Sequence, residues 1–192
     1  TINKNTTNFI YGESGSGKST LVEIILGLIK PNSGEVLVED KNIFENVRDW
    51  QNNVGYVPQR IFLINTNIKK NIILSEMDEN FRKEDFEKII SDCNIENLDL
   101  NEDVGESGKK LSLGQIQRVG IARALYKKGT NLIVFDEITS SLDEHNTAEI
   151  MSNIKNLNKN FTILFISHDK NLSKYFENKY ELKNKQITLI KD

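Results

Sequence analysis

The sequence contains very little cysteine, with one such residue, Cys93, in a chain of 192. A single thiol cannot form a disulfide within the chain, so the disulfide frameworks of small secreted proteins are excluded and a reducing compartment is favoured. No histidine lies near Cys93 in the sequence, so nothing indicates that its thiol is reactive. We therefore expect Cys93 to be an inert residue of a helix over residues 81–93.

Long apolar runs and a strong charge of either sign are also missing. No run approaches the roughly 18 residues that a membrane-spanning helix needs, and the N-terminus shows no signal-peptide pattern, so we expect these residues alone to be soluble and cytosolic. The net charge of −3 gives no long-range field for gathering nucleic acid, although a local basic patch remains possible. We expect no nucleic-acid partner. With 38% hydrophobic residues, the chain can bury a substantial core in one domain.

What the sequence does contain is a glycine-rich segment near its start. It follows a short apolar stretch, leads into a helix-like pattern, and consists of Gly12, Glu13, Ser14, Gly15, Ser16, Gly17, Lys18, Ser19 and Thr20. Glycines let consecutive backbone N–H groups point at phosphates, and the following helix adds its positive end. Lys18 then reaches the β- and γ-phosphates and the Ser19 hydroxyl coordinates Mg²⁺. A flexible Gly/Ser linker needs neither the lysine nor this context. The segment predicts binding of a nucleoside triphosphate.

The remaining pattern alternates between strands and helices. We expect strands at residues 9–11, 35–39, 54–57, 131–135, 161–167 and within 178–190, and helices at 18–28, 81–93, 115–127 and 145–157. The continuous apolar runs at 131–135 and 161–167 are typical of strands buried on both faces of a parallel sheet. This pattern predicts an α/β fold of the P-loop NTPase (RecA-like) type. Its core covers about residues 1–66 and 129–192, and an inserted α-helical subdomain covers about 67–128.

Two of the predicted strands end in residues suited to catalysis. Asp136 and Glu137 follow one apolar strand, where the first acid can hold Mg²⁺ and the second can polarise an attacking water. His168 ends the next strand at the same edge and can contact a γ-phosphate. An acid pair at a strand end can also be an ordinary surface feature, and a lone histidine is usually structural. The phosphate loop favours the catalytic interpretation of both.

Taken together, these motifs resemble those of the nucleotide-binding domain of ATP-binding-cassette (ABC) proteins. After the loop at 12–20, residues 56–59 resemble the family's Q-loop, 111–115 its signature and 140–143 its D-loop; Asp136-Glu137 and His168 complete the series. Residues 67–72 and 103–108 further resemble segments that ABC exporters carry. The resemblance therefore favours an exporter, although 103–108 can also be an ordinary loop before a helix.

The resemblance implies roles for individual residues. Residues 12–20 bind ATP; Glu137, His168, Gln59 and Lys18 form the catalytic set; and Mg²⁺ is held by Ser19, Gln59 and Asp136. Ser112, Gly114 and Gln115 stand near the start of a helix, whose N–H groups and dipole suit a γ-phosphate. In the family that phosphate belongs to ATP held by a second subunit. Leu113 replaces the glycine usual in the signature, and we still expect the segment to function.

The resemblance also implies partners. We expect a second copy of this domain that closes head-to-tail around two ATP molecules, and a transmembrane domain upstream in the same polypeptide, which would place the domain at the cytoplasmic face of a membrane. The family's adenine-stacking aromatic residue lies before the phosphate loop, so we expect residues 1–192 to be one nucleotide-binding domain trimmed at both ends. Two alternatives are a soluble ABC ATPase acting on nucleic acid or ribosomes, and a regulatory ATP clamp. Basic arms or a coiled-coil insertion would favour the first, and this sequence has neither. Loss of Glu137 or His168 would favour the second, and both residues are present.

Overall fold

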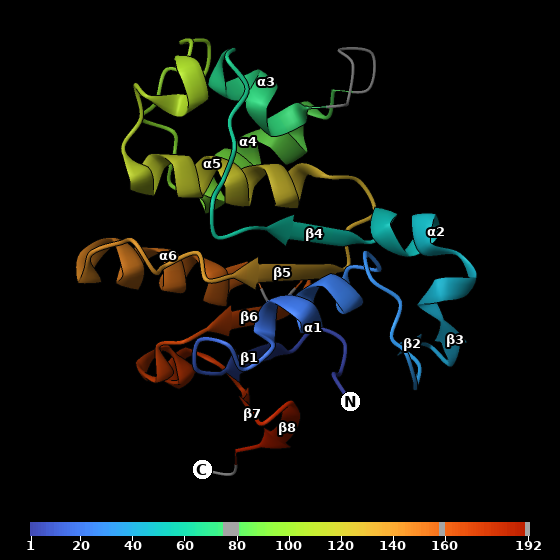
Figure 1. Ribbon diagram of the computed structural model, residues 1–192. Helices are drawn as coiled ribbons and strands as arrows, with labels where there is room; N and C mark the ends of the chain where they lie inside the picture. Colours follow the sequence, from blue (N-terminus) through green and yellow to red (C-terminus); the bar gives the residue numbers. More distant parts are fainter. Residues whose placement is uncertain (75–80, 158–159, 191–192) are drawn as a thin grey trace.

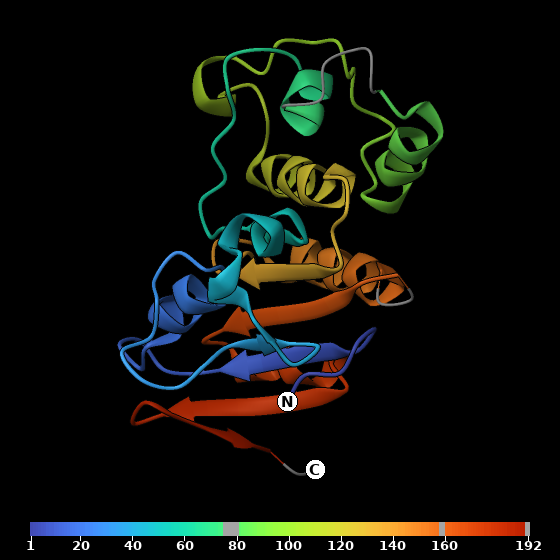
Figure 2. The same cartoon turned by 90° about the vertical axis from the view of Figure 1, so that its right-hand side faces the viewer.

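A twisted sheet forms the centre of the protein in the computed structural model, which describes residues 1–74, 81–157 and 160–190 (Figure 1). Among these residues the sheet has six strands: β4 (Val54–Val57), β5 (Leu132–Asp136), β6 (Thr162–Ser167), β1 (Thr7–Tyr11), β7 (Asn178–Lys183) and β8 (Gln186–Leu189), in that order. All neighbouring pairs are parallel except β7 and β8 (Figure 2). The predicted α/β fold with a mostly parallel sheet is confirmed.

The central strands β5 and β6 are buried on both faces. Ile133, Val134 and Phe135 are inaccessible to solvent, as are the four residues 163–166. Residues of alternating position point to opposite faces of a strand, so a strand covered on both sides must be apolar throughout. The continuous apolar runs therefore identified these two strands correctly.

Different helices cover the two faces of the sheet. On one face, α1 (Lys18–Ile25) packs Val22 against Ile10 and Val134. On the other face, α6 (Glu144–Leu157) contributes Ile150, Met151 and Ile154 to a larger apolar cluster. The phosphate loop joins β1 to α1 and lies at the carboxyl edge of the sheet, where β4, β5 and β6 also end (Figure 2).

Three further helices lie beyond the β4 edge of the sheet (Figure 1): α3 (Ile68–Ile73), α4 (Lys83–Asp92) and α5 (Leu113–Tyr126). Their apolar faces join the larger cluster through buried side chains such as Ile72, Phe86 and Ile121. The expected helices at 81–93 and 115–127 are thus present with shifted ends. Cys93 is buried directly after α4, as expected of an inert residue, and burial raises the pKa of its thiol.

Two expected elements are shorter than their sequence patterns indicate. The helix expected at 18–28 ends at Ile25, because Gly27 has a φ of +69° that breaks the helix, and Leu28 is 62% exposed. The strand expected at 35–39 is reduced to β2 (Leu37–Val38), which pairs with β3 (Lys41–Asn42) and is exposed. The sequence pattern alone therefore predicted both elements to be longer than they are.

Short elements complete the described chain: α2 (Val47–Asn52) and the 3₁₀ helices η1 (Ile43–Glu45), η3 (Glu106–Gly108) and η4 (Lys170–Tyr175). The half-buried Trp50 of α2 packs beside the α1 face of the sheet, and its Nε1 donates a hydrogen bond of 2.7 Å to the Ile25 carbonyl. This bond and packing join α2 to the end of α1.

Candidate active site

The phosphate loop takes a shape that depends on its glycines. Gly15 and Gly17 have φ values of +80° and +104°, in the left-handed region that favours glycine. At Gly12 the constraint is space instead, since a Cβ there would lie 2.5 Å from Ser16 Oγ and 3.0 Å from the Leu182 carbonyl oxygen. The loop therefore requires glycine at 15 and 17 for its backbone conformation and at 12 for its contact with β7.

Lys18 is enclosed by the loop. Only 7% of its surface is exposed, and its Nζ donates hydrogen bonds to the carbonyl oxygens of Gly12, at 2.7 Å, and Glu13, at 3.0 Å. The same nitrogen lies 3.2 Å from Glu137 Oε1. Ser19 follows on the first turn of α1 and is exposed. The loop thus holds its cation in place and leaves the Ser19 hydroxyl open to ligands.

Glu137 is the point where the predicted catalytic residues meet. Its Oε2 accepts a hydrogen bond of 3.4 Å from Gln59 Nε2 and lies 3.2 Å from His168 Nδ1, while Lys18 approaches the other oxygen. Gln59 follows β4, Glu137 follows β5 and His168 follows β6. Because parallel strands bring their carboxyl ends to one edge, residues far apart in the sequence converge there.

The backbone at Glu137 is strained. Its φ is +51°, which a residue with a side chain rarely adopts, and its N–H donates a 2.9 Å hydrogen bond to the Ile166 carbonyl. Such conformations cost about 1–3 kcal/mol and persist only where the surrounding structure holds them, often at functional sites. Here the bond to β6 fixes the turn that directs the carboxylate toward Lys18 and His168.

Asp136 lies beside Glu137 and has a different environment. Its Oδ2 accepts a 3.2 Å hydrogen bond from the Tyr56 hydroxyl. Burial raises the pKa of Asp136; the Tyr56 hydrogen bond opposes this effect and the neighbouring Glu137 charge adds to it. Burial and the Asp136 carboxylate together raise the pKa of Tyr56 to about 12, so Tyr56 stays a hydrogen-bond donor.

Sequence reasoning did not identify Tyr56 as a partner of Asp136. Tyr56 pairs in register with Val134, two residues before Asp136 on the neighbouring strand. Residues two apart on a strand share a face, so this tyrosine could have been placed beside the acid once β4 was paired with β5. The missing signal was strand order, which a single sequence does not state.

The signature segment forms the start of α5. Ser112 is the N-cap: its Oγ accepts a 3.2 Å hydrogen bond from the Gln115 N–H, and the Gln115 side-chain oxygen accepts one of 2.8 Å from the Ser112 N–H. Gly114 is buried at this end of the helix, where a Cβ would lie 3.1 Å from Asn146 Oδ1. Leu113 is 44% exposed. The expected helix start is confirmed, with reciprocal capping between its residues.

The signature and the phosphate loop do not meet in one chain. Within the described parts of the protein, no hydrogen bond or ion pair joins Ser112, Gly114 or Gln115 to residues 12–20 or to Glu137. α5 lies beyond the β4 edge, whereas the loop lies between β1 and α1 (Figure 1). The structure therefore brings together Lys18, Gln59, Glu137 and His168, and leaves the signature apart.

The residues at this edge suit a magnesium–nucleotide complex. Ser19 offers a hydroxyl, Asp136 a carboxylate, and Gln59 an amide oxygen, because its amide nitrogen is directed to Glu137 and Ser140. Mg²⁺ prefers oxygen ligands and commonly takes only one or two carboxylates together with substrate phosphates. Among the described residues, no group of three or more His, Cys, Asp or Glu side chains is arranged to hold a metal ion. Ser16 Oγ, inside the loop, is buried without a hydrogen-bond partner.

Comparisons with known proteins agree with this geometry. Residues 1–140 match the profile of a family described as ABC transporter. A putative export ATP-binding/permease protein of Rickettsia typhi is 35% identical over 87% of this chain and 30% of its own length. A molybdate/tungstate import ATP-binding protein of Methanocaldococcus jannaschii is 37% identical over 83% of this chain and 53% of its own length.

The fold is also similar to a solved structure. A bacterial Atm1-family ABC exporter with ATP bound superposes with a TM-score of 0.85 and 27% identity, over 96% of this chain and 33% of that one. The chain thus spans about a third or less of the length of the exporters that it resembles. Within the described ranges, none of the helices has both the length and the apolar character needed to cross a membrane.

Proposed function

Because this chain belongs to the ABC transporter family, we propose that it is the ATP-binding and ATP-hydrolysing motor domain of an ABC exporter. The observation that carries the proposal is the convergence of Lys18, Gln59 and His168 on the Glu137 carboxylate beside the phosphate loop. A cation for phosphates, a polar amide and a carboxylate within hydrogen-bond reach are the groups that phosphoryl transfer to water needs.

The exporter assignment is supported by two segments that the structure places side by side. Asn67 and Asp103 form an isolated β-bridge, and the Val104 N–H donates a 3.0 Å hydrogen bond to the Thr66 carbonyl. The two exporter-like stretches, 67–72 and 103–108, therefore begin at a shared contact and form one surface. We propose that this surface receives the membrane domain, which places the chain at the cytoplasmic face of a membrane.

Each residue of the site has a distinct part in the proposed reaction. The N–H groups of the loop and Lys18 would bind the phosphates, and Ser19, Asp136 and Gln59 would hold Mg²⁺, which would supply charge neutralisation at the phosphate oxygens. Lys18 now lies between loop carbonyls and Glu137, so phosphate binding competes for the cation that pairs with this carboxylate. Glu137 can then accept a proton from the attacking water, and His168 and Gln59 can orient the oxygen of that water.

We further propose that two copies complete each other's sites. Ser112, Gly114 and Gln115 form a helix start suited to a phosphate, and they do not reach the loop of their own chain. A head-to-tail pair would place this helix start of one copy against the ATP of the other. In this arrangement residues of about 1–66 and 129–192 act as the ATP-holding core, and about 67–128 act as the helical subdomain that presents the signature.

The proposal is tested by measuring ATP binding and hydrolysis in the presence of Mg²⁺. The wild-type chain should bind and hydrolyse ATP, and Lys18→Ala should lose most binding because the buried ammonium is removed from the loop. Lys30→Ala, at an exposed lysine outside the loop, is the matched control and should behave as wild type. Equal binding by the Lys18 and Lys30 variants, or no turnover by the wild type, would refute the proposal.

A second candidate, the ATPase subunit of an importer, is favoured by the 37% identity to the molybdate/tungstate import protein. The two candidates differ in what precedes this domain. The gene sequence upstream of codon 1 distinguishes them: membrane spans in the same reading frame support an exporter, and a separately encoded permease supports an importer.

A further inference from the structure

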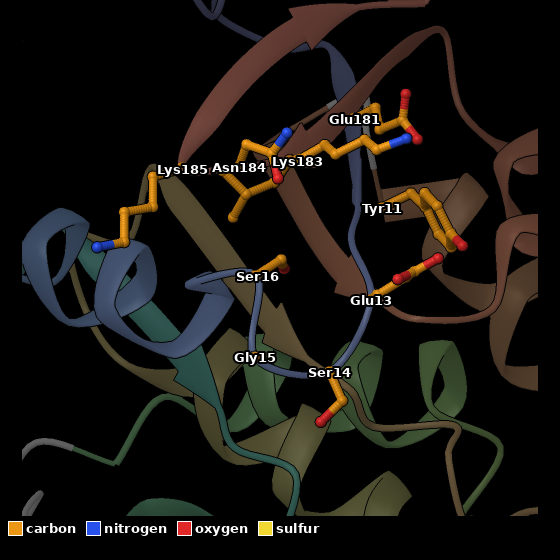
Figure 3. Close-up of a pocket in the computed structure, with 10 residues that line it drawn as sticks. Tyr11, Glu13, Ser14, Gly15, Ser16, Glu181, Lys183, Asn184 and Lys185 are labelled. Atoms are coloured by element: carbon orange, nitrogen blue, oxygen red, sulfur yellow. The ribbon is translucent and has the colours of Figure 1, made fainter.

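A cavity of about 320 Å³ lies between the phosphate loop and the turn of the β7–β8 hairpin (Figure 3). The loop lines one side with residues 13–16, and the hairpin lines the other with residues 181–185; Tyr11 lies at one end. The two walls are in direct contact at their base, where the Leu182 carbonyl oxygen would lie 3.0 Å from a Cβ placed on Gly12. The hairpin therefore holds its turn beside the loop.

The turn itself has an unusual residue. Lys183 pairs with Gln186, so Asn184 and Lys185 form a two-residue turn, and both have positive φ values, +50° and +61°. Turns of this shape favour asparagine followed by glycine, because glycine has no Cβ to clash in the left-handed region. A lysine at the second position is unfavourable, because its Cβ clashes with the backbone in this left-handed conformation. Strained residues of this kind often carry a function.

The charges around the cavity are arranged unevenly. Tyr11, Glu13 and Glu181 lie toward one side together with the ammonium end of Lys183, whereas the Lys185 side chain leaves the turn on the α1 side (Figure 3). Among the described residues, Lys185 forms no hydrogen bond or ion pair, unlike the enclosed Lys18. Ser16 Oγ, on the loop wall, is buried without a partner. A free ammonium group, which extends over α1, and an unpaired hydroxyl on the loop wall thus both lie on the side where α1 begins.

We propose that Lys185 is a nucleotide-binding residue whose ammonium group contacts the phosphate chain from the hairpin side of the loop. This inference rests on the proposed function, because it assumes that the loop holds a nucleotide. Phosphates bound by the loop lie at the N-terminus of α1. An exposed lysine on this side of the loop adds a screened but favourable charge interaction.

Lys185→Gly separates binding from stability. Glycine relieves the positive φ, so the variant should be at least as stable as wild type to heat. Its affinity for ATP, measured by isothermal titration at about 0.1 M salt, should fall about three- to fivefold, as expected for one partly exposed charge pair. The loss should shrink at high salt because ionic screening weakens this contact. Lys185→Arg keeps the charge and should keep the affinity.

Asp40→Gly provides the matched control. Asp40 occupies the second position of the two-residue β2–β3 turn with a φ of +62°, so glycine relieves the same backbone conformation away from the loop. This variant should bind ATP as wild type does. Inorganic triphosphate should show the same loss as ATP in Lys185→Gly, because the contact is to phosphate.

The outcomes separate this inference from the function on which it rests. A wild-type chain that fails to bind ATP refutes the proposed function. If the wild type binds ATP and Lys185→Gly binds it equally well, the inference about Lys185 is wrong and the function stands. A loss confined to ATP, with triphosphate unaffected, also refutes the phosphate contact.

Discussion

Glu137 is surrounded by three side chains that can each bind a carboxylate oxygen. Lys18 contributes a charge from the start of α1, whereas Gln59 contributes an amide N–H and His168 a ring nitrogen from the ends of β4 and β6. The positive φ at Glu137 holds the carboxylate between them. An acid placed in this way can take up a proton without moving away from the residues that orient it.

Replacing this acid should separate binding from hydrolysis. Glu137→Gln preserves the size and the hydrogen-bonding shape of the side chain but cannot accept a proton. Single-turnover phosphate release at saturating ATP·Mg should fall at least about a hundredfold, while ATP affinity stays within about threefold of wild type. Glu144→Gln, at an exposed acid of α6, is the control and should hydrolyse normally. Wild-type turnover by Glu137→Gln would show that another group is the base.

The ionised Asp136 carboxylate should reduce the stability of the folded chain. Burial raises its pKa above the ordinary 3.8, so the folded chain binds this proton more tightly than the unfolded chain does. The free energy of unfolding therefore falls as the pH rises above that value. Asp136→Asn, without nucleotide, should melt about 1–3 °C higher than wild type at pH 8, and the difference should close toward pH 4. A variant that melts lower than wild type at pH 8 would contradict this.

At the scale of elements, one residue at the start of α5, Ser112, both stabilises the helix and has a proposed role in binding. Ser112 caps the helix and, in the proposed pair, faces a phosphate of the second copy. Ser112→Ala should lose the cap, which costs about 1 kcal/mol, and melt about 2–4 °C lower. Ser112→Asp keeps a good cap but adds a negative charge.

Comparing the two variants assigns the two roles. In size-exclusion chromatography with ATP·Mg, both should pair less than wild type, whereas thermal unfolding should be impaired only in Ser112→Ala. Normal pairing by Ser112→Asp would show that Ser112 acts in the capping of α5 alone.

The elements differ in how well the sequence predicted them. β5 and β6 follow continuous apolar runs and were placed within one residue at each end, because strands buried on both faces leave a plain pattern. β4 was placed at its observed ends, although it is an edge strand with Tyr56 exposed. The helix expected at 18–28 failed at Gly27, whose left-handed backbone the apolar spacing does not encode. β2 is an exposed strand of two residues, so burial gave no reason for its predicted length.

The candidate site was predictable in its residues and not in its contacts. The sequence pointed to Lys18, Gln59, Glu137 and His168, which the structure brings together, because motifs at strand ends share an edge in a parallel sheet. It did not indicate the hydrogen bond from Tyr56 to Asp136 or the turn at Lys185. Both depend on which strands are neighbours and on how a hairpin packs, which long-range pairing decides.

At the scale of the whole molecule, the chain separates two halves of one proposed reaction site. The phosphate loop lies against the sheet, and the signature lies on α5 beyond the β4 edge (Figure 1). No described hydrogen bond connects them within a chain. A second copy is the partner that would bring both halves to one nucleotide, and ATP would then hold the pair together until hydrolysis releases it.

The most direct test of this shared site is the mass of Glu137→Gln in solution by light scattering after size-exclusion chromatography. With ATP·Mg the variant should elute at about twice the monomer mass of 22.0 kDa, because slow hydrolysis preserves the pair, and without nucleotide it should be monomeric. A monomeric mass at an ATP concentration that titration shows to be saturating would contradict the shared site.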